Sequence, residues 1–355
     1  MGYIDVVGKW NLNNNNWDYN TEYNYRGRSF AFVNYEDIIN NKNEGIDYLI
    51  FAYGTRVEDC SKDFFTVRDS YMGIDKVIRY FKKLNKNIVV SLFLMDADAP
   101  IVEDAKKMAQ YIDNLSILQN TNSVNLIGVS KCGAMLFNTP KYFKREISFR
   151  KTNLYTVATP FIGTKLASPS IFYPEVERLI VSKLGKNKIS DIVYKELIKM
   201  YESVSSNSHM DYDISMLGGI SLDKLKLYDD SLIKNMFSKD NIDAISRISN
   251  YRNLVTGIDN KTLSEAIRTM NFNGIGLCLL NELFFDGKSD GMVTTAAQRE
   301  IERQIGMEDL KSDLLVSSHH DVASNNRVFG DILYILNDTI DEYNEKVKYR
   351  SRKIK

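Results

Sequence analysis

Short, almost continuously apolar runs alternate with amphipathic stretches along the first half of the chain. Runs of this length and composition are typical of strands that are buried on both faces of a parallel sheet. The runs are residues 28–33, 46–53, 87–94, 125–129 and 153–158. Residues 69–84 and 102–118 have apolar positions at helical spacing, and Pro100 precedes the second stretch. Strands that alternate with helices predict an α/β fold with a mostly parallel sheet flanked by helices.

The alternation of strands and helices stops after Pro160. From residue 168 to residue 250 the pattern is helical, and residues 174–184 and 189–201 are amphipathic. Residues 251–257 are then predicted to resume the sheet. Ligands bind at the carboxyl edge of open α/β sheets. The helical block is therefore predicted to be a cap over that edge, and peripheral packing without substrate contact is the alternative.

This pattern divides the chain into a core and an insertion. The core comprises residues 1–167 and 251–355, and a helical cap at residues 168–250 is inserted after the sixth strand region. The opening twenty-odd residues are polar, with four asparagines in a row at residues 13–16, and are predicted to be loop-like.

One run ends in a pattern that holds a nucleophile in many enzymes. After the apolar residues 125–129 come Ser130 and then small residues that begin a helix. A sharp strand-to-helix turn of this kind pushes a serine hydroxyl out of the sheet. Gly128 stands two residues before the serine, but Cys132 occupies the place where the usual pattern has glycine, and Gly133 follows one residue late. The alternative is an ordinary strand-turn-helix junction with an incidental serine.

The composition of the chain argues against several classes of binding partner. The 355 residues contain 46 basic and 46 acidic side chains, so no overall charge favours nucleic acid or an anionic surface. The three cysteines have no metal-site spacing and cannot form a complete disulfide framework. No early segment reads as a signal, and no apolar run is long enough to span a bilayer. We expect a cytoplasmic protein without nucleic-acid partners, stable membrane insertion or a bound metal.

A serine nucleophile needs a base, and the chain has three histidines. His209 lies in a polar part of the helical block, far from any predicted strand end. His319 and His320 follow the apolar residues 313–317, which are predicted to be the last strand. A histidine just beyond the final strand suits the chain order serine, acid, histidine. A surface pair of histidines is the alternative.

Two Asp-Gly turns between residue 257 and the histidines supply the candidate acid. Asp290 is preferred because Met292 and Val293 follow it and anchor the turn, whereas Asp286 is the second choice. The oxyanion formed on attack needs backbone N–H donors. Lys131, directly after the serine, is predicted to supply one donor, and Thr55, just beyond the run at residues 46–53, is predicted to supply the other.

Together these segments resemble the α/β-hydrolase superfamily, in its lipase-like serine esterase branch. The most distinctive stretch is Thr159-Pro160 with Gly163, Thr164 and Ala167, which is similar to a threonine-proline-x-x-glycine-threonine-x-x-alanine segment of lipases. The other similar segments are residues 48–55, 126–135, 289–293 and 319–321. Two residues depart from the pattern: Tyr53 replaces the usual histidine of the oxyanion loop, and Cys132 replaces glycine.

The resemblance implies an activity and a set of site residues. Its His-x-Asp sequence matches residues 319–321 and favours His319 over His320 as the base. Asp321 has no evident partners for the structural calcium that some bacterial lipases hold at this place. The implied function is hydrolysis of a carboxylic ester of a small-molecule or lipid-like acyl substrate, with Ser130, His319 and Asp290 as the triad and no cofactor. Acyl transfer by the same triad and a catalytically inactive binding scaffold are the alternatives, and the oligomeric state is open.

Overall fold

The fold is derived from a computed structural model of the chain. The structure describes residues 8–11, 16–18, 24–25, 28–33, 45–53, 83, 88–94, 101–117, 121–163, 169–205, 236–257, 289–290, 293–305, 312–316 and 334. The predicted helix at residues 69–84 lies outside this part of the chain, apart from Lys83.

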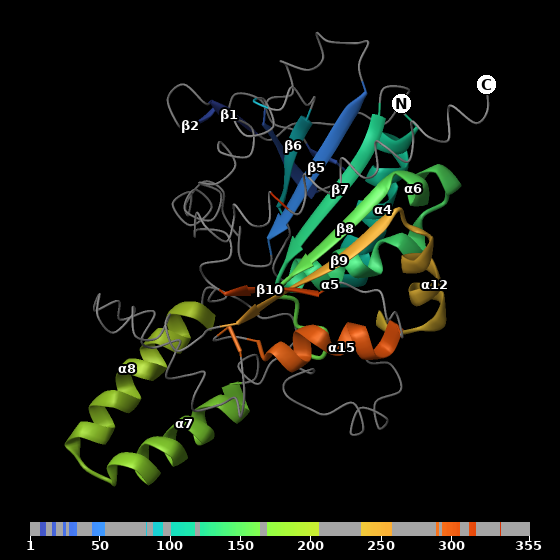
Figure 1. The fold of residues 1–355 in the computed structure, drawn as a ribbon. Coiled ribbons are helices and arrows are strands. Elements are labelled where there is room, and N and C mark those ends of the chain that lie inside the picture. Colours follow the sequence, from blue (N-terminus) through green and yellow to red (C-terminus); the bar gives the residue numbers. More distant parts are fainter. Residues whose placement is uncertain are drawn as a thin grey trace, which may run out of the picture.

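A single sheet of ten strands forms the centre of the described part (Figure 1). The strands are β1 (Gly8–Asn11), β2 (Asn16–Asp18), β3 (Asn24–Tyr25), β4 (Arg28–Val33), β5 (Ile46–Tyr53), β6 (Ile88–Leu94), β7 (Thr121–Val129), β8 (Thr152–Val157), β9 (Asn250–Gly257) and β10 (Ser312–Val316). Their order is β10-β9-β8-β7-β5-β6-β4-β1-β2, with β3 paired to β4. All pairs from β10 to β6 are parallel. The prediction of a mostly parallel sheet with helices around it is confirmed.

The amino-terminal segment differs from the prediction. Residues 8–11 and 16–18 were expected to be loop-like, but β1 and β2 form an antiparallel pair in which Trp10 stands opposite Trp17. β1 also pairs in parallel with β4. Aromatic residues favour strands, and these two occupy one cross-strand position despite the polar residues around them. The asparagine-rich composition of this segment indicated a loop and gave no sign of the pairing.

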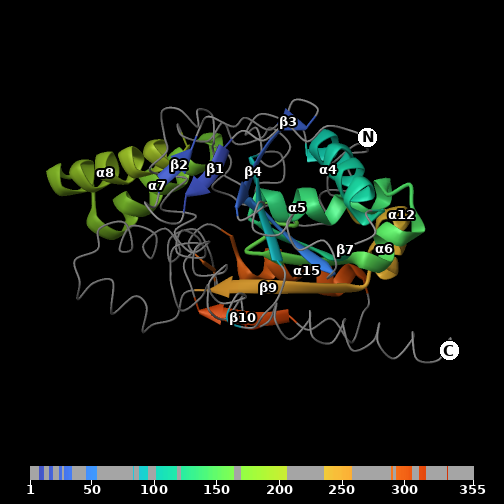
Figure 2. The same cartoon turned by 90° about the horizontal axis from the view of Figure 1, so that it is seen from above.

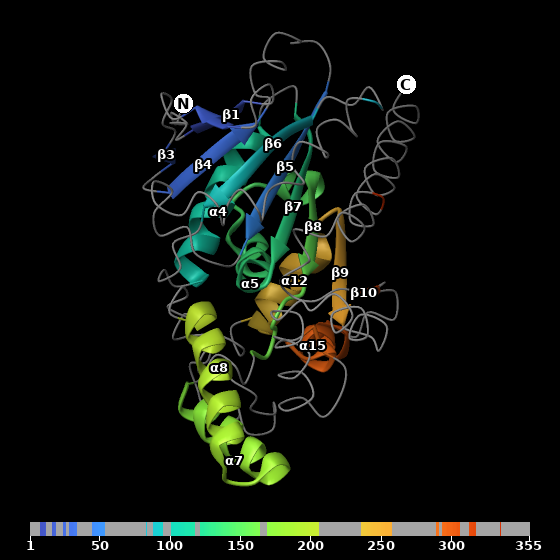
Figure 3. The ribbon, with the colours of Figure 1, turned by 90° about the vertical axis from the view of Figure 1, so that its left-hand side faces the viewer.

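Helices α4 (Ile101–Ser116) and α5 (Lys131–Asn138) pack on each other beside the central strands (Figures 2 and 3). The other described helices of the core are η1 (Pro140–Tyr142), α6 (Glu146–Lys151), α12 (Lys239–Arg247) and α15 (Thr295–Ile305). Ring packing joins the end of β8 to α5, because Phe161 meets Phe137 edge-on with centroids 5.4 Å apart. Both rings are fully buried.

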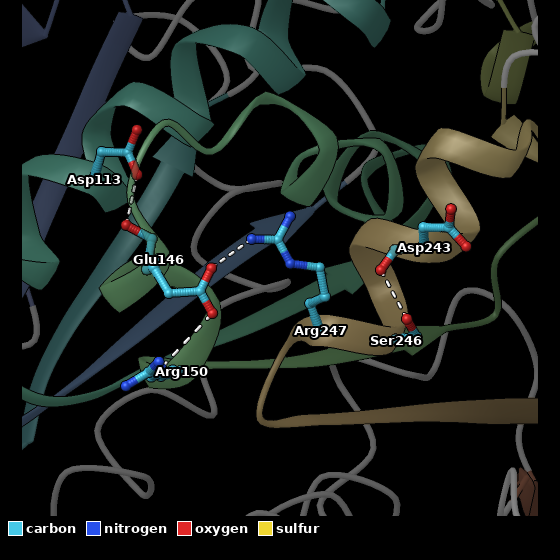
Figure 4. Close-up of polar contacts among 7 residues, drawn as sticks. Asp113, Glu146, Arg150, Asp243, Ser246 and Arg247 are labelled. Atoms are coloured by element: carbon cyan, nitrogen blue, oxygen red, sulfur yellow. Dashed lines mark hydrogen bonds and ion pairs between the residues drawn. The ribbon is translucent and has the colours of Figure 1, made fainter.

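Polar contacts connect α6 to its neighbours on the outer side of this core (Figure 4). Glu146 forms ion pairs with Arg150 and with Arg247 of α12, and the Arg247 guanidinium lies 3.8 Å from the centroid of the Phe149 ring. Asp113 of α4 accepts a hydrogen bond from the Ser148 hydroxyl, and both residues are buried. Exposed ion pairs contribute at most about 1 kcal/mol each, so the buried hydrogen bond between Ser148 and Asp113 is the stronger connection.

The helical block begins with a two-helix hairpin. α7 (Pro169–Leu184) and α8 (Lys188–Ser205) pack against each other and lie beyond the carboxyl ends of the parallel strands (Figures 1 and 3). Both predicted helices are present, and each extends beyond its predicted bounds. Among the described residues, no helix is long and apolar enough to cross a membrane.

Candidate active site

The carboxyl ends of the central parallel strands form a staggered edge. Tyr53 of β5, Val129 of β7 and Val157 of β8 are at one level in the strand register, and Leu254 of β9 continues it. β9 and β10 run on past this level to the pair Gly257 and Val316. The segments that follow β5, β7 and β10 carry the predicted site residues, so the topology brings their starting points to one edge of the sheet.

Ser130 occupies the turn between β7 and α5 in a strained conformation. Its backbone angles are φ 56° and ψ −130°, a region that a residue with a side chain rarely adopts. The Ser130 N–H donates to the Val157 carbonyl at 2.9 Å, and its carbonyl accepts from the Gly133 N–H at 2.9 Å. Strain of this kind costs about 1–3 kcal/mol and persists only where the surroundings impose it. These two bonds fix the turn, which is the sharp strand-to-helix geometry expected of a nucleophile-bearing serine.

Two glycines allow the close contacts around the turn. A Cβ atom at Gly128 would lie 2.7 Å from the Cys132 carbonyl oxygen and 2.8 Å from the Gly133 Cα atom. A Cβ atom at Gly133 would overlap the Thr159 side chain, with 2.9 Å to its Cβ atom. Gly133, which stands one place later than the usual pattern expects, is therefore required by its packing against Thr159 in the segment after β8. This explains the departure from the usual spacing.

Cys132 is enclosed beside the serine and has no exposed surface. Burial raises the pKa of its thiol above the ordinary value, the nearby Lys131 charge lowers it to a smaller extent, and Asp104 adds a further increase. A raised thiol pKa keeps the sulfur protonated at neutral pH, and a neutral thiol is a poor nucleophile. Cys132 thus fills the position of the expected glycine as a packing residue.

Asp290 is fully buried and is held by three donors. Its Oδ1 atom accepts from the Val293 N–H at 2.8 Å. Its Oδ2 atom accepts from the Thr256 hydroxyl at 2.6 Å and from the Gln298 amide at 3.3 Å. The Asp290 N–H in turn donates to the Val293 carbonyl at 3.2 Å. These contacts fix the turn and the orientation of the carboxyl group near the end of β9.

Thr256 and Gln298 are the residues of this site that the sequence did not indicate. Gln298 is buried on α15, and its Oε1 atom accepts from the Thr256 N–H at 2.7 Å. Its amide also donates to the Thr256 carbonyl at 3.1 Å. Gln298 thereby ties together the end of β9, the Asp290 turn and the start of α15. The one sequence signal for this role is that Gln298 lies on a helix eight residues after Asp290. A glutamine at that spacing is common, so the signal is weak.

Replacing Gln298 by leucine is expected to lower the free energy of unfolding by about 2–3 kcal/mol, because several buried polar groups lose their partner. Urea unfolding followed by circular dichroism measures the change. Gln110→Leu is the matched control, since Gln110 lies half-buried on α4, and we expect its effect to stay within about 0.5 kcal/mol. Equal stability of Gln298→Leu and the wild-type protein would show that this network does not hold the turn.

The structure describes some of the predicted site residues and not others. Lys131 is the first residue of α5, where backbone N–H groups point out of the helix. The predicted residues outside the described part are Thr55, His209, Asp286, His319, His320 and Asp321. His319 follows the end of β10 by three residues, and β10 is the neighbour of β9. β7 and β9 are separated by β8 alone, so roughly 10 Å lies between these two strands.

No metal centre is formed by the described residues, among which no group of three or more histidine, cysteine, aspartate or glutamate side chains is placed to hold an ion. The described polar groups near this edge of the sheet are the Ser130 turn, the buried Asp290 carboxyl group and the N–H groups at the start of α5.

No protein-family model matches the sequence, and no curated protein matches it significantly. Solved structures do match: the mature lipase of Bacillus licheniformis has 13% identity, covers 82% of this chain and 91% of its own, and gives a TM-score of 0.37. A lipase-esterase related protein from Clostridium acetobutylicum has 13% identity over 88% and 99% of the two chains with a TM-score of 0.40. A carboxylesterase structure from Nitrososphaera gargenis has 11% identity over 85% and 92%, with a TM-score of 0.39. The names of these three distant matches describe lipases and esterases.

Proposed function

We propose that the protein is a serine hydrolase that cleaves a carboxylic ester through an acyl-enzyme intermediate. The observation that carries the proposal is the strained backbone of Ser130 at a turn with two tightly packed glycines. An incidental serine at a strand-helix junction has no need of a positive φ, which costs stability. Strain that the surroundings impose on one polar residue is what a presented nucleophile requires.

In the proposed reaction, the Ser130 hydroxyl attacks the ester carbonyl while His319 accepts its proton. Asp290 orients the imidazole and stabilises its charged form. The support for this role is that Asp290 is buried and that its contacts with Val293, Thr256 and Gln298 fix the orientation of its carboxyl group. The negative oxygen that forms is held by the N–H groups of Lys131 and Thr55. His319 then protonates the leaving alcohol, and water releases the acyl group by the reverse sequence.

The helical block at residues 168–250 is proposed to cap this site and to select the substrate. The support is the place of the α7–α8 hairpin beyond the carboxyl ends of the parallel strands (Figure 1). Acyl transfer to an alcohol or amine would use the same residues and differ only in the acceptor. Product analysis with such an acceptor present separates it from hydrolysis.

The test of the proposal is labelling with a fluorophosphonate, which forms a stable adduct only with an activated serine. We expect one adduct on the folded protein, and peptide mapping should place it on Ser130. Ser130→Ala should lose the adduct while keeping the wild-type unfolding transition. Absence of labelling in the folded wild-type protein would leave only a non-catalytic scaffold, whereas labelling that persists in Ser130→Ala would show that the nucleophile is a different residue.

A further inference from the structure

The connecting end of the α7–α8 hairpin exposes four aliphatic side chains. Val181 and Leu184 lie in the last turn of α7, with 37% and 45% of their surface exposed. Ile189 and Ile192 lie in the first turns of α8, with 66% and 62% exposed. The inward side of the same hairpin is well packed, since Val176 and Ile180 are buried. The exposed aliphatic residues thus gather at the end of the hairpin, which we call the hairpin tip (residues 181–195).

Hydrogen bonds of the backbone and of Asn187 fix the turn of the hairpin tip. Gly185 adopts φ 70° and its N–H donates to the Val181 carbonyl at 2.9 Å, a common end for a helix. Asn187 caps α8, because its side-chain oxygen accepts from the N–H groups of Ile189 at 2.8 Å and Ser190 at 3.0 Å. The Ser190 hydroxyl accepts from the Asn187 N–H at 2.9 Å. The exposure of the isoleucines next to this cap is therefore a fixed feature of the turn.

The hairpin tip is basic in a chain whose total charge is zero. Residues 181–195 contain four lysines and one aspartate, a formal charge of +3. Lys186, Lys188 and Lys195 are exposed. Asp191, the acidic residue of the tip, lies in the first turn of α8, where a negative charge stabilises the helix. Glu196 lies just beyond the tip and is paired with Lys199. Three exposed lysines thus lie within a few residues of the exposed aliphatic side chains in the sequence.

We propose that the hairpin tip docks on an anionic lipid surface, with its aliphatic side chains in the headgroup layer and its lysines on the phosphates. Aliphatic and lysine side chains in combination are typical of elements that lie in a membrane interface. The tip is the narrow end of a hairpin that projects from the sheet (Figure 3). A stable contact between proteins needs roughly 800 Å² on each partner, which a narrow end does not readily supply, whereas a bilayer accepts a small protruding element. This docking is independent of the chemistry at Ser130.

The experiment is co-sedimentation of the full chain with vesicles. Vesicles of phosphatidylcholine alone are compared with vesicles of phosphatidylcholine and phosphatidylglycerol in equal amounts. We expect binding to the anionic vesicles at least tenfold tighter than to the neutral ones, and weaker binding at about 0.5 M salt, which screens the lysines. Ile189→Ser/Ile192→Ser and Lys186→Glu/Lys188→Glu should each reduce the binding constant roughly tenfold or more.

The control variant is Ile117→Ser, which removes an isoleucine that is 49% exposed just after α4. It should bind vesicles like the wild-type protein, and thermal unfolding should show that all variants are folded. Absence of binding to anionic vesicles would overturn the proposal, as would equal binding by Ile189→Ser/Ile192→Ser. Self-association that the isoleucine variant abolishes, without vesicle binding, would assign the tip to a second copy of the chain instead. Fluorophosphonate labelling of Ser130 is scored separately, so the failure of one proposal is distinguishable from the failure of the other.

Discussion

Ser130→Ala and His319→Ala are expected to lower kcat for a short-chain aryl ester by about 10⁴- to 10⁶-fold, and Asp290→Asn by about 10⁴-fold. In the proposed mechanism, removing the nucleophile or the base stops the covalent step itself. An amide at position 290 fails for a different reason. The Val293 N–H faces one carboxyl oxygen, so the asparagine must place its NH₂ group opposite Thr256 and Gln298. In the proposed mechanism, the His319 imidazole then loses the acceptor that sets its tautomer and stabilises its positive charge.

Controls separate these roles from simple loss of structure. Steady-state kinetics on the three variants should be accompanied by urea unfolding, with Ser130→Ala as stable as the wild-type protein. His320→Ala and Asp286→Asn are the matched variants and should retain most of the activity. An inactive His320→Ala beside an active His319→Ala would show that the base is the second histidine. The double variant Ser130→Ala/His319→Ala should be no slower than the worse single variant, because the two residues act as a unit.

The central strands and the helices next to them were predictable because their signals are local. Mostly apolar runs predicted β5, β7 and β8 within a few residues of their bounds, and the segment at residues 251–257 was predicted to resume the sheet as β9. The turn at Ser130 was visible as a strand, a small residue and the start of a helix. Such signals depend on burial and on backbone sterics within about ten residues, and a single sequence carries both.

What the sequence did not reveal depends on contacts between distant segments. The pairing of β1 with β2 puts Trp10 and Trp17 at opposite positions of the strand register, and the asparagine-rich composition gives no sign of this pairing. Gln298 looks like a surface residue of an amphipathic helix, yet it is buried against Thr256 of β9, 42 positions away in the chain. The meaning of Cys132 and Gly133 likewise depends on Thr159, which packs against α5 only in the folded chain.

Gly133→Ala is the second change with a large expected effect. Whether it raises or lowers the free energy of unfolding tests the packing of α5. In an ordinary helix position alanine is more favourable than glycine by about 1 kcal/mol. In α5 the added Cβ atom would overlap Thr159 Oγ1 and approach Thr159 Cγ2 to 3.0 Å. We expect the free energy of unfolding to fall by about 3 kcal/mol, because neither the helix nor the segment after β8 has room to move. Urea unfolding measures the change, and Gly45→Ala is the control, since its Cβ atom would lie 3.2 Å from Asn122 Cβ, where a small shift is sufficient.

The clash at Gly133 involves one side chain, so a second substitution tests its cause. Thr159→Gly removes every atom that the new Cβ atom would meet within 3.0 Å. Although this change destabilises on its own, the double variant Gly133→Ala/Thr159→Gly should be more stable than the sum of the two single effects by about 1–3 kcal/mol. Additive effects would mean that Gly133 is required for a reason other than its contact with Thr159. A positive coupling would show that the close contact between α5 and the segment after β8 is made at Gly133 and not at position 132. The strained turn at Ser130 depends on this contact.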